Sequence, residues 1–296
     1  MNQKTLLWVE EYLFDPNLLQ KILSFSLLPL TLLYCIVVVT KRFFAKPKDF
    51  GIDIISIGNL IVGGSGKTPF TIAYAKDKKN IAIILRGYGR ESHGLYIVSD
   101  GKKILTETKI SGDEAMLIAT SLPNAIVIVS EDRVEAILKA KELNAKKIIL
   151  DDGFSKSNIK KFDILLKPKN EPKNRFCLPS GGYREPYFFY KKANLVLQED
   201  IDFKRVVTIK NQTSKMILVT AISKPKRLNE FLPKNVIEKI YFPDHYYFKK
   251  KELEELMQKY EADSILTTQK DEIKMREFNL NLSIMELELE ASFISN

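Results

Sequence analysis

The sequence predicts an α/β protein: a P-loop-containing, mostly parallel sheet core with an N-terminal membrane-associated helix and a second, smaller α/β domain. Two observations predict this class. From residue 53 onward, short apolar runs alternate with longer amphipathic stretches, as strands and helices do in a sheet covered on both faces. In addition, the glycine-rich segment 56–69 follows the first such strand and precedes the first such helix.

Composition sets limits on the class of protein. The chain has 296 residues, of which 45% are hydrophobic and 28% charged, so it is neither a disordered chain nor a polytopic membrane protein. Its two cysteines, Cys35 and Cys177, form no CxxC pair and argue against a disulfide framework or a thiolate zinc site. The two histidines exclude a His-rich metal site.

The N-terminal segment, residues 1–46, contains an uncharged stretch of 18 residues from Ile22 to Val39. As one helix it would be about 27 Å long, against a hydrocarbon core of about 30 Å. A helix that spans the bilayer, one that only embeds in it, and a buried helix of a soluble protein all remain open. Lys and Arg at 41, 42, 46 and 48 place the rest of the chain on the cytoplasmic side, because such residues favour that side.

The core domain is expected to cover residues 47–200. Its predicted strands are 54–57, 81–85, 125–129, 147–150, 164–166 and 195–197, and its predicted helices are 69–78, 113–120 and 133–143. A linker is expected at 201–210, where residues 205–209 nevertheless have a strand-like pattern. The smaller domain, 211–280, has predicted strands at 216–220, 237–242 and 264–267 and predicted helices at 224–231 and 249–260. Residues 281–296 are expected to return to the core.

The glycine-rich segment carries the strongest local motif. Its residues Gly63, Gly64, Ser65, Gly66, Lys67 and Thr68 resemble a phosphate-binding loop. In such a loop, backbone N–H groups surround phosphate oxygens, the lysine reaches the β- and γ-phosphates, and the hydroxyl binds Mg²⁺. The strict pattern requires glycine where this chain has Ile61, so a glycine-rich turn with a chance GKT sequence is the alternative.

Two acidic sites accompany this loop. Asp151 and Asp152 directly follow the predicted strand 147–150, where a carboxylate that holds Mg²⁺ is expected, although a simple turn would have the same sequence. Asp113 opens a predicted helix, and taken alone it is better explained as a helix cap.

Positive charge is concentrated in one segment. The net charge of +9 arises from 46 Lys and Arg against 37 Asp and Glu, and residues 155–192 carry ten Lys and Arg against three acidic residues, a net of +7. A solvated surface explains most such segments, whereas nucleic acid, anionic lipid or a phosphorylated substrate are the functional explanations.

Eight blocks occur in order along residues 50–275: IGNLIVGGSGKTPF, RGYGR, SGDEA, EDRVEA, LDDGF, LPSGGYREP, FPDHYYF and TTQKDEIK. This series resembles the tetraacyldisaccharide 4′-kinase family, the lipid A 4′-kinases of Gram-negative bacteria. The resemblance implies ATP-dependent phosphorylation of the 4′-hydroxyl of a tetraacyldisaccharide 1-phosphate, which gives lipid IVA. It implies ATP and Mg²⁺ as cofactors and the cytoplasmic face of the inner membrane as the location. It also implies anionic inner-membrane lipids as partners, without nucleic acid or an obligate protein partner.

The resemblance assigns roles residue by residue. Nucleotide binding falls on the loop residues 63–68, and Mg²⁺ binding falls on Thr68, Asp151, Asp152 and Glu185. Asp113 is the implied general base, with His245 working beside it from the second domain. The remaining matches are Lys67 and Arg133 as catalytic residues near phosphate, and Asn59, Arg86 and Arg184 as substrate-binding residues.

Three departures from the family pattern put nucleoside and lipid contacts in question: Ser155-Lys156, Gly182-Tyr183 and Gln269. Another P-loop NTPase, such as a GTPase, is the alternative enzyme, because residues 268–271 (TQKD) resemble a guanine-reading motif with altered spacing. A membrane-tethered nucleotide-binding scaffold is the non-catalytic alternative, but it would need neither Asp113 nor His245. Nucleic-acid binding ranks third, since no recognised module supports it.

Overall fold

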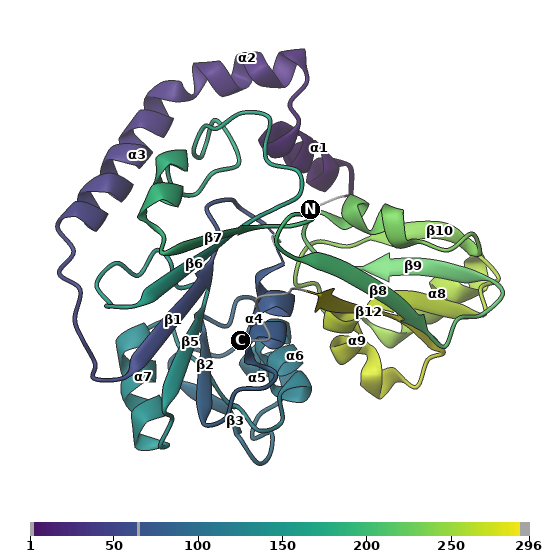
Figure 1. The fold of residues 1–296 in the computed structure, drawn as a ribbon. Coiled ribbons are helices and arrows are strands. Elements are labelled where there is room, and N and C mark those ends of the chain that lie inside the picture. The colour runs from purple at the N-terminus through teal and green to yellow at the C-terminus, as the bar shows by residue number, and fades with distance from the viewer. Residues whose placement is uncertain (1–2, 64–65, 291–296) are drawn as a thin grey trace.

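The computed structural model describes residues 3–63 and 66–290, and its two sheets lie side by side with helices around them (Figure 1). The first sheet has seven strands in the order β3-β4-β2-β5-β1-β6-β7, and all neighbours are parallel except β3 and β4. The strands are β1 (Asp53–Gly58), β2 (Ile81–Leu85), β3 (Tyr96–Asp100), β4 (Ile126–Val129), β5 (Lys147–Asp151), β6 (Phe162–Lys167) and β7 (Leu195–Gln198). The predicted P-loop core with a mostly parallel sheet is therefore confirmed.

Helices cover both faces of this sheet. Two apolar clusters show this, one joining the sheet to Phe70 and Ile118 and the other joining it to Ala136 and Ile137. These side chains belong to α4 (Lys67–Ala75) and α6 (Asp113–Ser121) on one face and to α7 (Arg133–Glu142) on the other; α5 (Thr108–Ser111) precedes α6. The apolar strands are continuous because both of their faces are buried.

The second sheet has five strands in the order β10-β9-β11-β12-β8, with only β8 antiparallel to its neighbour. Its elements are β8 (Lys204–Lys210), β9 (Met216–Thr220), β10 (Val236–Tyr241), β11 (Ser264–Thr268) and β12 (Leu282–Glu290), with α8 (Lys250–Lys259), α9 (Gln269–Met275) and the 3₁₀ helices η2 (Pro225–Phe231) and η3 (Arg276–Phe278). A further 3₁₀ helix, η1 (Tyr187–Lys192), belongs to the first domain.

Three boundaries differ from the sequence prediction. The expected linker contains β8, which is an edge strand of the second sheet. The segment expected to return to the core contains β12, which lies between β11 and β8, although its Leu289 does pack against the core cluster. The helix expected at 224–231 is a 3₁₀ helix over Pro225–Phe231, preceded by the left-handed backbone of Lys224.

The N-terminal segment forms α1 (Gln3–Phe14), α2 (Leu18–Ser26) and α3 (Leu28–Phe43), and α2 and α3 arch over the outer side of the first domain (Figure 1). The single helix expected over 22–39 is therefore wrong: the chain bends by 57° between α2 and α3. Pro29 lies in the first turn of α3, where its missing N–H costs nothing, but it cannot continue α2. Within the described residues, no single helix is long and apolar enough to cross a membrane. The bent pair of α2 and α3, taken together, has the length and the apolar composition of a membrane span.

Two polar residues of the stretch, Ser24 and Thr31, are buried against the protein, whereas Ser26 is exposed. Ser24 Oγ donates a hydrogen bond to the carbonyl of Ser180, and Thr31 Oγ1 donates one to Ser180 Oγ at 2.7 Å. The outward face is apolar, with these exposed side chains: Leu18, Leu19, Ile22, Leu23, Phe25, Leu30, Leu32, Leu33, Ile36, Val37, Phe43 and Phe44. The hydroxyls of Ser24 and Thr31 thus mark the side of the stretch that packs on the core.

Candidate active site

The glycine-rich loop connects β1 to α4 at the carboxyl edge of the first sheet, the edge at which α/β proteins bind ligands. Gly63 and Gly66 adopt the left-handed backbone conformation, with φ of +77° and +80°, and Gly66 caps α4. Lys67 is the first residue of α4, and its side chain and that of Thr68 line a cavity of about 570 Å³ between the two domains. The expected nucleotide-binding residues Gly64 and Ser65 lie outside the described residues.

A compact polar network supports the loop from within the first domain. Arg184 binds Asp152 with two hydrogen bonds, of 2.8 Å from Nη1 and 2.7 Å from Nη2. Asn59 Oδ1 accepts hydrogen bonds from Arg184 and from Lys67 Nζ, the latter at 3.3 Å, and Lys67 Nζ lies 3.8 Å from Asp152 Oδ1. Four residues expected to bind nucleotide, metal or substrate, namely Asn59, Lys67, Asp152 and Arg184, are therefore linked in one network.

The two adjacent carboxylates have opposite electrostatic environments. Burial raises the pKa of Asp151 to about 7, and Glu114 and Asp152 add to the rise, while Lys67 and a hydrogen bond from Thr71 oppose it. Burial would also raise the pKa of Asp152, but Lys67 and Arg184 outweigh it and hold that pKa well below its usual range.

Of the three carboxylates expected to bind Mg²⁺, Asp151 and Asp152 have surroundings that suit a divalent cation. Asp151 is crowded by negative charge, which a bound cation would relieve, and Thr68 lies in the first turn of α4. Glu185 is different, because its Oε2 accepts a hydrogen bond of 2.7 Å from Arg42 of α3. Among the described residues, no group of three or more acidic, histidine or cysteine side chains is arranged to hold a metal ion. The Mg²⁺ site stays a prediction, and Asp151, Asp152 and Thr68 are the residues that fit it.

Asp113 meets His245 across the cleft. Asp113 is the buried first residue of α6, and Gly112 precedes it as the cap; His245 lies in the loop between β10 and α8. His245 Nδ1 lies 3.0 Å from Asp113 Oδ1 and 3.2 Å from Oδ2. Two lysines of α9 complete the cluster: Lys274 Nζ is 3.4 Å and Lys270 Nζ 3.6 Å from Asp113 Oδ2.

This cluster fixes the charges of its members. Burial would raise the pKa of Asp113, but the hydrogen bond with His245 and the charges of Lys270, His245 and Lys274 hold it well below the usual range. Burial and Lys270 would lower the pKa of His245, but Asp113 and Asp244 raise it above its usual value. Asp113 is therefore a carboxylate with no proton, held against a histidine that favours the protonated form.

The two remaining arginines occupy different places. Arg133, at the start of α7, is buried, and its Nη1 donates to the carbonyl of Ser130. Burial lowers its pKa, while Asp151 and Asp152 act in the opposite direction, which places it within electrostatic range of the carboxylate pair. Arg86 is exposed after β2, with its guanidinium 5.2 Å from the centroid of the Tyr88 ring.

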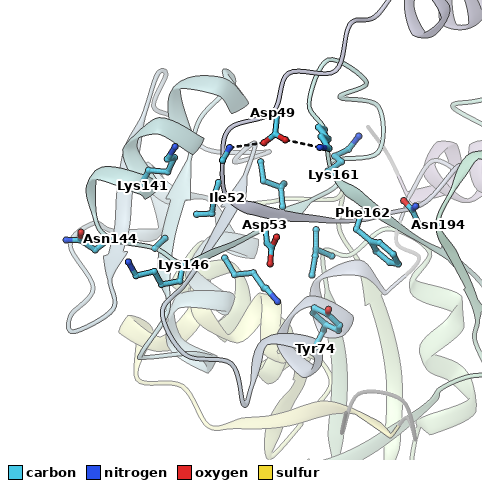
Figure 2. Close-up of a pocket in the computed structure, with 16 residues that line it drawn as sticks. Asp49, Ile52, Asp53, Tyr74, Lys141, Asn144, Lys146, Lys161, Phe162 and Asn194 are labelled. Carbon is cyan, nitrogen blue, oxygen red and sulfur yellow. Dashed lines mark hydrogen bonds and ion pairs between the residues drawn. The ribbon is translucent and has the colours of Figure 1, made fainter.

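A second cavity, of about 1120 Å³, lies at the opposite, amino edge of the first sheet (Figure 2). Five lysines line it, namely Lys141, Lys146, Lys147, Lys160 and Lys161. Asp49 pairs with Lys160 at 2.8 Å, and Asp53 opens β1 at its floor. It is remote from the phosphate loop, since strands of a parallel sheet present their two ends at opposite edges.

Comparison with known proteins agrees with the geometry of the cleft. The sequence model of the tetraacyldisaccharide-1-P 4′-kinase family matches residues 23–296. The chain belongs to this family. It is 63% identical over 296 residues to the tetraacyldisaccharide 4′-kinase of Aliarcobacter butzleri, covering 98% of this chain and 94% of the relative. It is 51% identical over 283 residues to the enzyme of that name from Helicobacter acinonychis, covering 96% and 90%.

A solved structure resembles the whole arrangement. The apo form of LpxK from Aquifex aeolicus in complex with ATP superposes with a TM-score of 0.74 at 29% identity, covering 90% of this chain and 95% of that one. The α/β fold of the tetraacyldisaccharide-1-P 4′-kinase family is thus shared over both domains.

Sequence reasoning missed three charged residues of the site. Lys270 and Lys274 are four residues apart on α9, and this helical spacing in the TTQKDEIK block is the signal that could have placed both on one face. Arg42 was interpreted only as a basic residue beside a membrane helix, and nothing in the sequence indicated its contact with Glu185. The guanine-reading alternative loses its support, because Asp271 is buried and accepts hydrogen bonds from Thr220 Oγ1 and the Ala221 amide.

Proposed function

We propose that this chain transfers the γ-phosphate of ATP to the 4′-hydroxyl of a tetraacyldisaccharide 1-phosphate, giving lipid IVA. The observation that carries the proposal is the contact of 3.0 Å between Asp113 and His245, which joins the two domains next to Glu114 and Lys270 of the cavity that the phosphate loop lines. Membership of the family supports the substrate, and the ATP complex of the Aquifex protein supports the phosphate donor.

The chain's own residues account for the chemistry as follows. A sugar hydroxyl is a weak nucleophile, so a carboxylate must accept its proton as the bond to phosphorus forms. Asp113 is ionised and buried, and His245 orients it through both carboxylate oxygens. Lys67, at the amino end of α4, stabilises the negative charge that develops on the transferred group.

Asp151, Asp152 and Thr68 are the residues that would hold Mg²⁺. When bound there, the ion would neutralise phosphate charge in the manner of other phosphoryl-transfer sites. Arg184 and Lys67 keep Asp152 ionised, and Thr71 donates a hydrogen bond to Asp151 Oδ1 at 3.2 Å. These contacts fix the orientation of Asp151 and Asp152 before any ligand binds.

The decisive test of this function is transfer of label. The full chain is incubated in mixed micelles with γ-labelled ATP, Mg²⁺ and tetraacyldisaccharide 1-phosphate. We expect label on the lipid, at the 4′ position. No transfer under conditions in which the Aliarcobacter enzyme is active would overturn the proposal.

We further propose that α2 and α3 hold the protein on the cytoplasmic face of the inner membrane. Their outward face is apolar, and the exposed Lys41 lies in the last turn of α3, where a basic residue favours anionic lipid headgroups. Replacing Leu32, Leu33 and Val37 by serine should release the chain from anionic vesicles in flotation experiments, while Ser24 and Thr31 stay unchanged to preserve packing on the core. Continued flotation would assign the attachment to another surface.

A further inference from the structure

The two left-handed glycines of the phosphate loop each face a cation from the second domain. A Cβ atom built on Gly66 would lie 2.7 Å from Arg205 Nη2, and one built on Gly63 would lie 3.3 Å from Lys224 Cε. Arg205 is in β8, and Lys224 caps η2. The second domain therefore places two positive side chains directly against the loop, from the side opposite Lys67 and the core.

Both side chains are held in place. Glu199 Oε2 accepts a hydrogen bond of 2.9 Å from Arg205 Nη2, and Glu199 Oε1 lies 2.5 Å from Arg205 Nε. This pair is nearly buried, with 9% and 12% of the two side chains exposed. Lys224 Nζ lies 3.3 Å from the centroid of the Phe14 ring. Ordered cations at a binding surface lose little entropy when an anion arrives.

Charge repulsion among these groups indicates what they bind. Burial lowers the pKa of Lys224 to about 7, and the charges of Arg227, Lys67 and Arg205 contribute to the decrease. Burial likewise lowers the pKa of Arg227 to about 10, with Arg205 adding to the effect. Glu10 and Glu199 offset only part of this charge. A cluster of four mutually repelling cations is stabilised by a ligand that carries several negative charges close together.

The space for such a ligand is present. The interdomain cavity is lined by Gly66, Lys67 and Thr68 on one side and by Arg205, Lys224 and Arg227 on the other. Its volume of about 570 Å³ is within the usual range for small-molecule sites. In loops of this kind the backbone surrounds the α- and β-phosphates, and Gly66 is the residue immediately before Lys67.

We propose that Arg205 and Lys224 are phosphate-contacting residues, through which the second domain binds the diphosphate portion of the nucleotide held by the loop. The inference deepens the proposed function, because it rests on nucleotide binding at this loop. It adds a consequence for the fold: the nucleotide joins the two domains, since its phosphates contact the loop of one and the cations of the other.

The test measures nucleotide affinity without lipid. Dissociation constants of ATP, ADP and AMP are determined by calorimetry for the full chain and for Arg205→Met and Lys224→Met. Loss of one hydrogen bond to a charged group should weaken ADP and ATP by about tenfold to a hundredfold. AMP, which lacks the β-phosphate, should lose less. Arg205→Lys should recover part of the affinity, because it retains the charge but not the planar donor pair.

Two further variants serve as controls. Lys204→Met removes an exposed cation of β8 one residue away and should leave all three constants unchanged. The double variant Arg205→Met/Glu199→Gln removes the buried pair together, so that no unpaired carboxylate remains; the loss of ADP affinity should persist in it. Thermal unfolding of each variant shows whether it is folded.

Each other outcome overturns the inference. An equal loss for AMP and ADP would give the two cations a purely structural role. A loss confined to ATP would move the contact to the γ-phosphate, and unchanged nucleotide affinity with a raised KM for lipid would assign the cations to the lipid phosphate. The affinity measurements contain no lipid, so the two proposals can fail separately. If the wild-type chain does not phosphorylate lipid, while Arg205→Met still weakens ADP binding, the proposed function is refuted and this inference stands.

Discussion

Asp152, which is partly buried, and Asp113, which is buried, both have pKa values lowered by cationic neighbours, yet these neighbours come from different parts of the fold. Asp152 is held by Arg184 and Lys67, which belong to its own domain. Asp113 is held by His245 and by the lysines of α9, which all belong to the second domain. The network around Asp152 is thus assembled by the first domain alone, and only Arg205 and Lys224 of the second domain are proposed to join the nucleotide site. The acid–base pair, by contrast, exists only when both domains are in place. Binding and chemistry should therefore respond separately to mutation.

The largest expected effect is on the interdomain pair. Asp113→Asn preserves shape but cannot accept a proton, so kcat for lipid phosphorylation should fall by about 10²–10⁴-fold. The dissociation constant of ATP should change little, because neither Asp113 nor its partners His245, Lys270 and Lys274 are among the residues proposed to bind the nucleotide. Asp100→Asn, at the end of β3 in the same domain, is the matched control and should retain full activity. A loss of ATP affinity as large as the loss of kcat would show that the two networks are not separable.

A smaller effect is expected within the first domain. Arg184→Lys keeps the charge but cannot make both hydrogen bonds to Asp152. Losing one charged hydrogen bond should raise KM for ATP roughly tenfold. The pKa of His245 should stay unchanged in this variant. A shift of that pKa would mean that the two networks are coupled.

The substitution Glu185→Gln tests whether the Glu185 carboxylate pairs with Arg42 of α3 or binds a metal ion. Arg42 can still donate to the amide oxygen, so the free energy of unfolding should fall by only about 1 kcal/mol, measured by denaturant titration. The Mg²⁺ concentration needed for half-maximal activity should not move. A tenfold increase in that concentration would return Glu185 to the set of metal ligands that the resemblance implied.

The last prediction concerns proton binding by the interdomain pair. The chain has two histidines, so ring resonances are easily assigned by NMR with His93→Gln. His245 should titrate above its usual value in the wild type. In Asp113→Asn the pKa of His245 should fall, because burial and Lys270 lower it and the Asp113 carboxylate no longer opposes them. A pKa that does not respond to this substitution would mean that the domains do not meet in solution.

The same pair makes stability depend on pH. A histidine whose pKa is raised on folding stabilises the folded state below its unfolded pKa, and this contribution is lost as pH rises through the folded value. A carboxylate with a lowered pKa stabilises above its unfolded pKa, and this is lost as pH falls. The difference in unfolding free energy between the wild type and His245→Gln should therefore shrink as pH rises past the pKa of His245.

The sequence predicted the elements that depend on local pattern and missed the contacts that depend on distance along the chain. Short, continuously apolar runs predicted β1, β2, β4, β5 and β6 to within one or two residues at each end, because strands that are buried on both faces are apolar throughout. β12 was not predicted, because its alternation of Leu and Glu can be identified as a strand only when its neighbours β8 and β11 are known. Motifs predicted Asp113 and His245. Arg42, Lys270 and Arg205, however, are defined by Glu185, Asp113 and Gly66, which lie 139 to 157 residues away along the chain, and single-sequence patterns carry no such information.

The position of β12 has a consequence for synthesis of the protein. It is the last strand of the described chain, yet it lies inside the second sheet, between β11 and β8. All strands of the first sheet precede residue 199, so that domain can fold while the ribosome is still translating the rest. The second sheet cannot close until residue 290 has left the ribosome. The sheet that carries Asp151 and Lys67 at its edge can therefore form first, and the second sheet, from which His245 reaches Asp113, forms only after residue 290 has been translated.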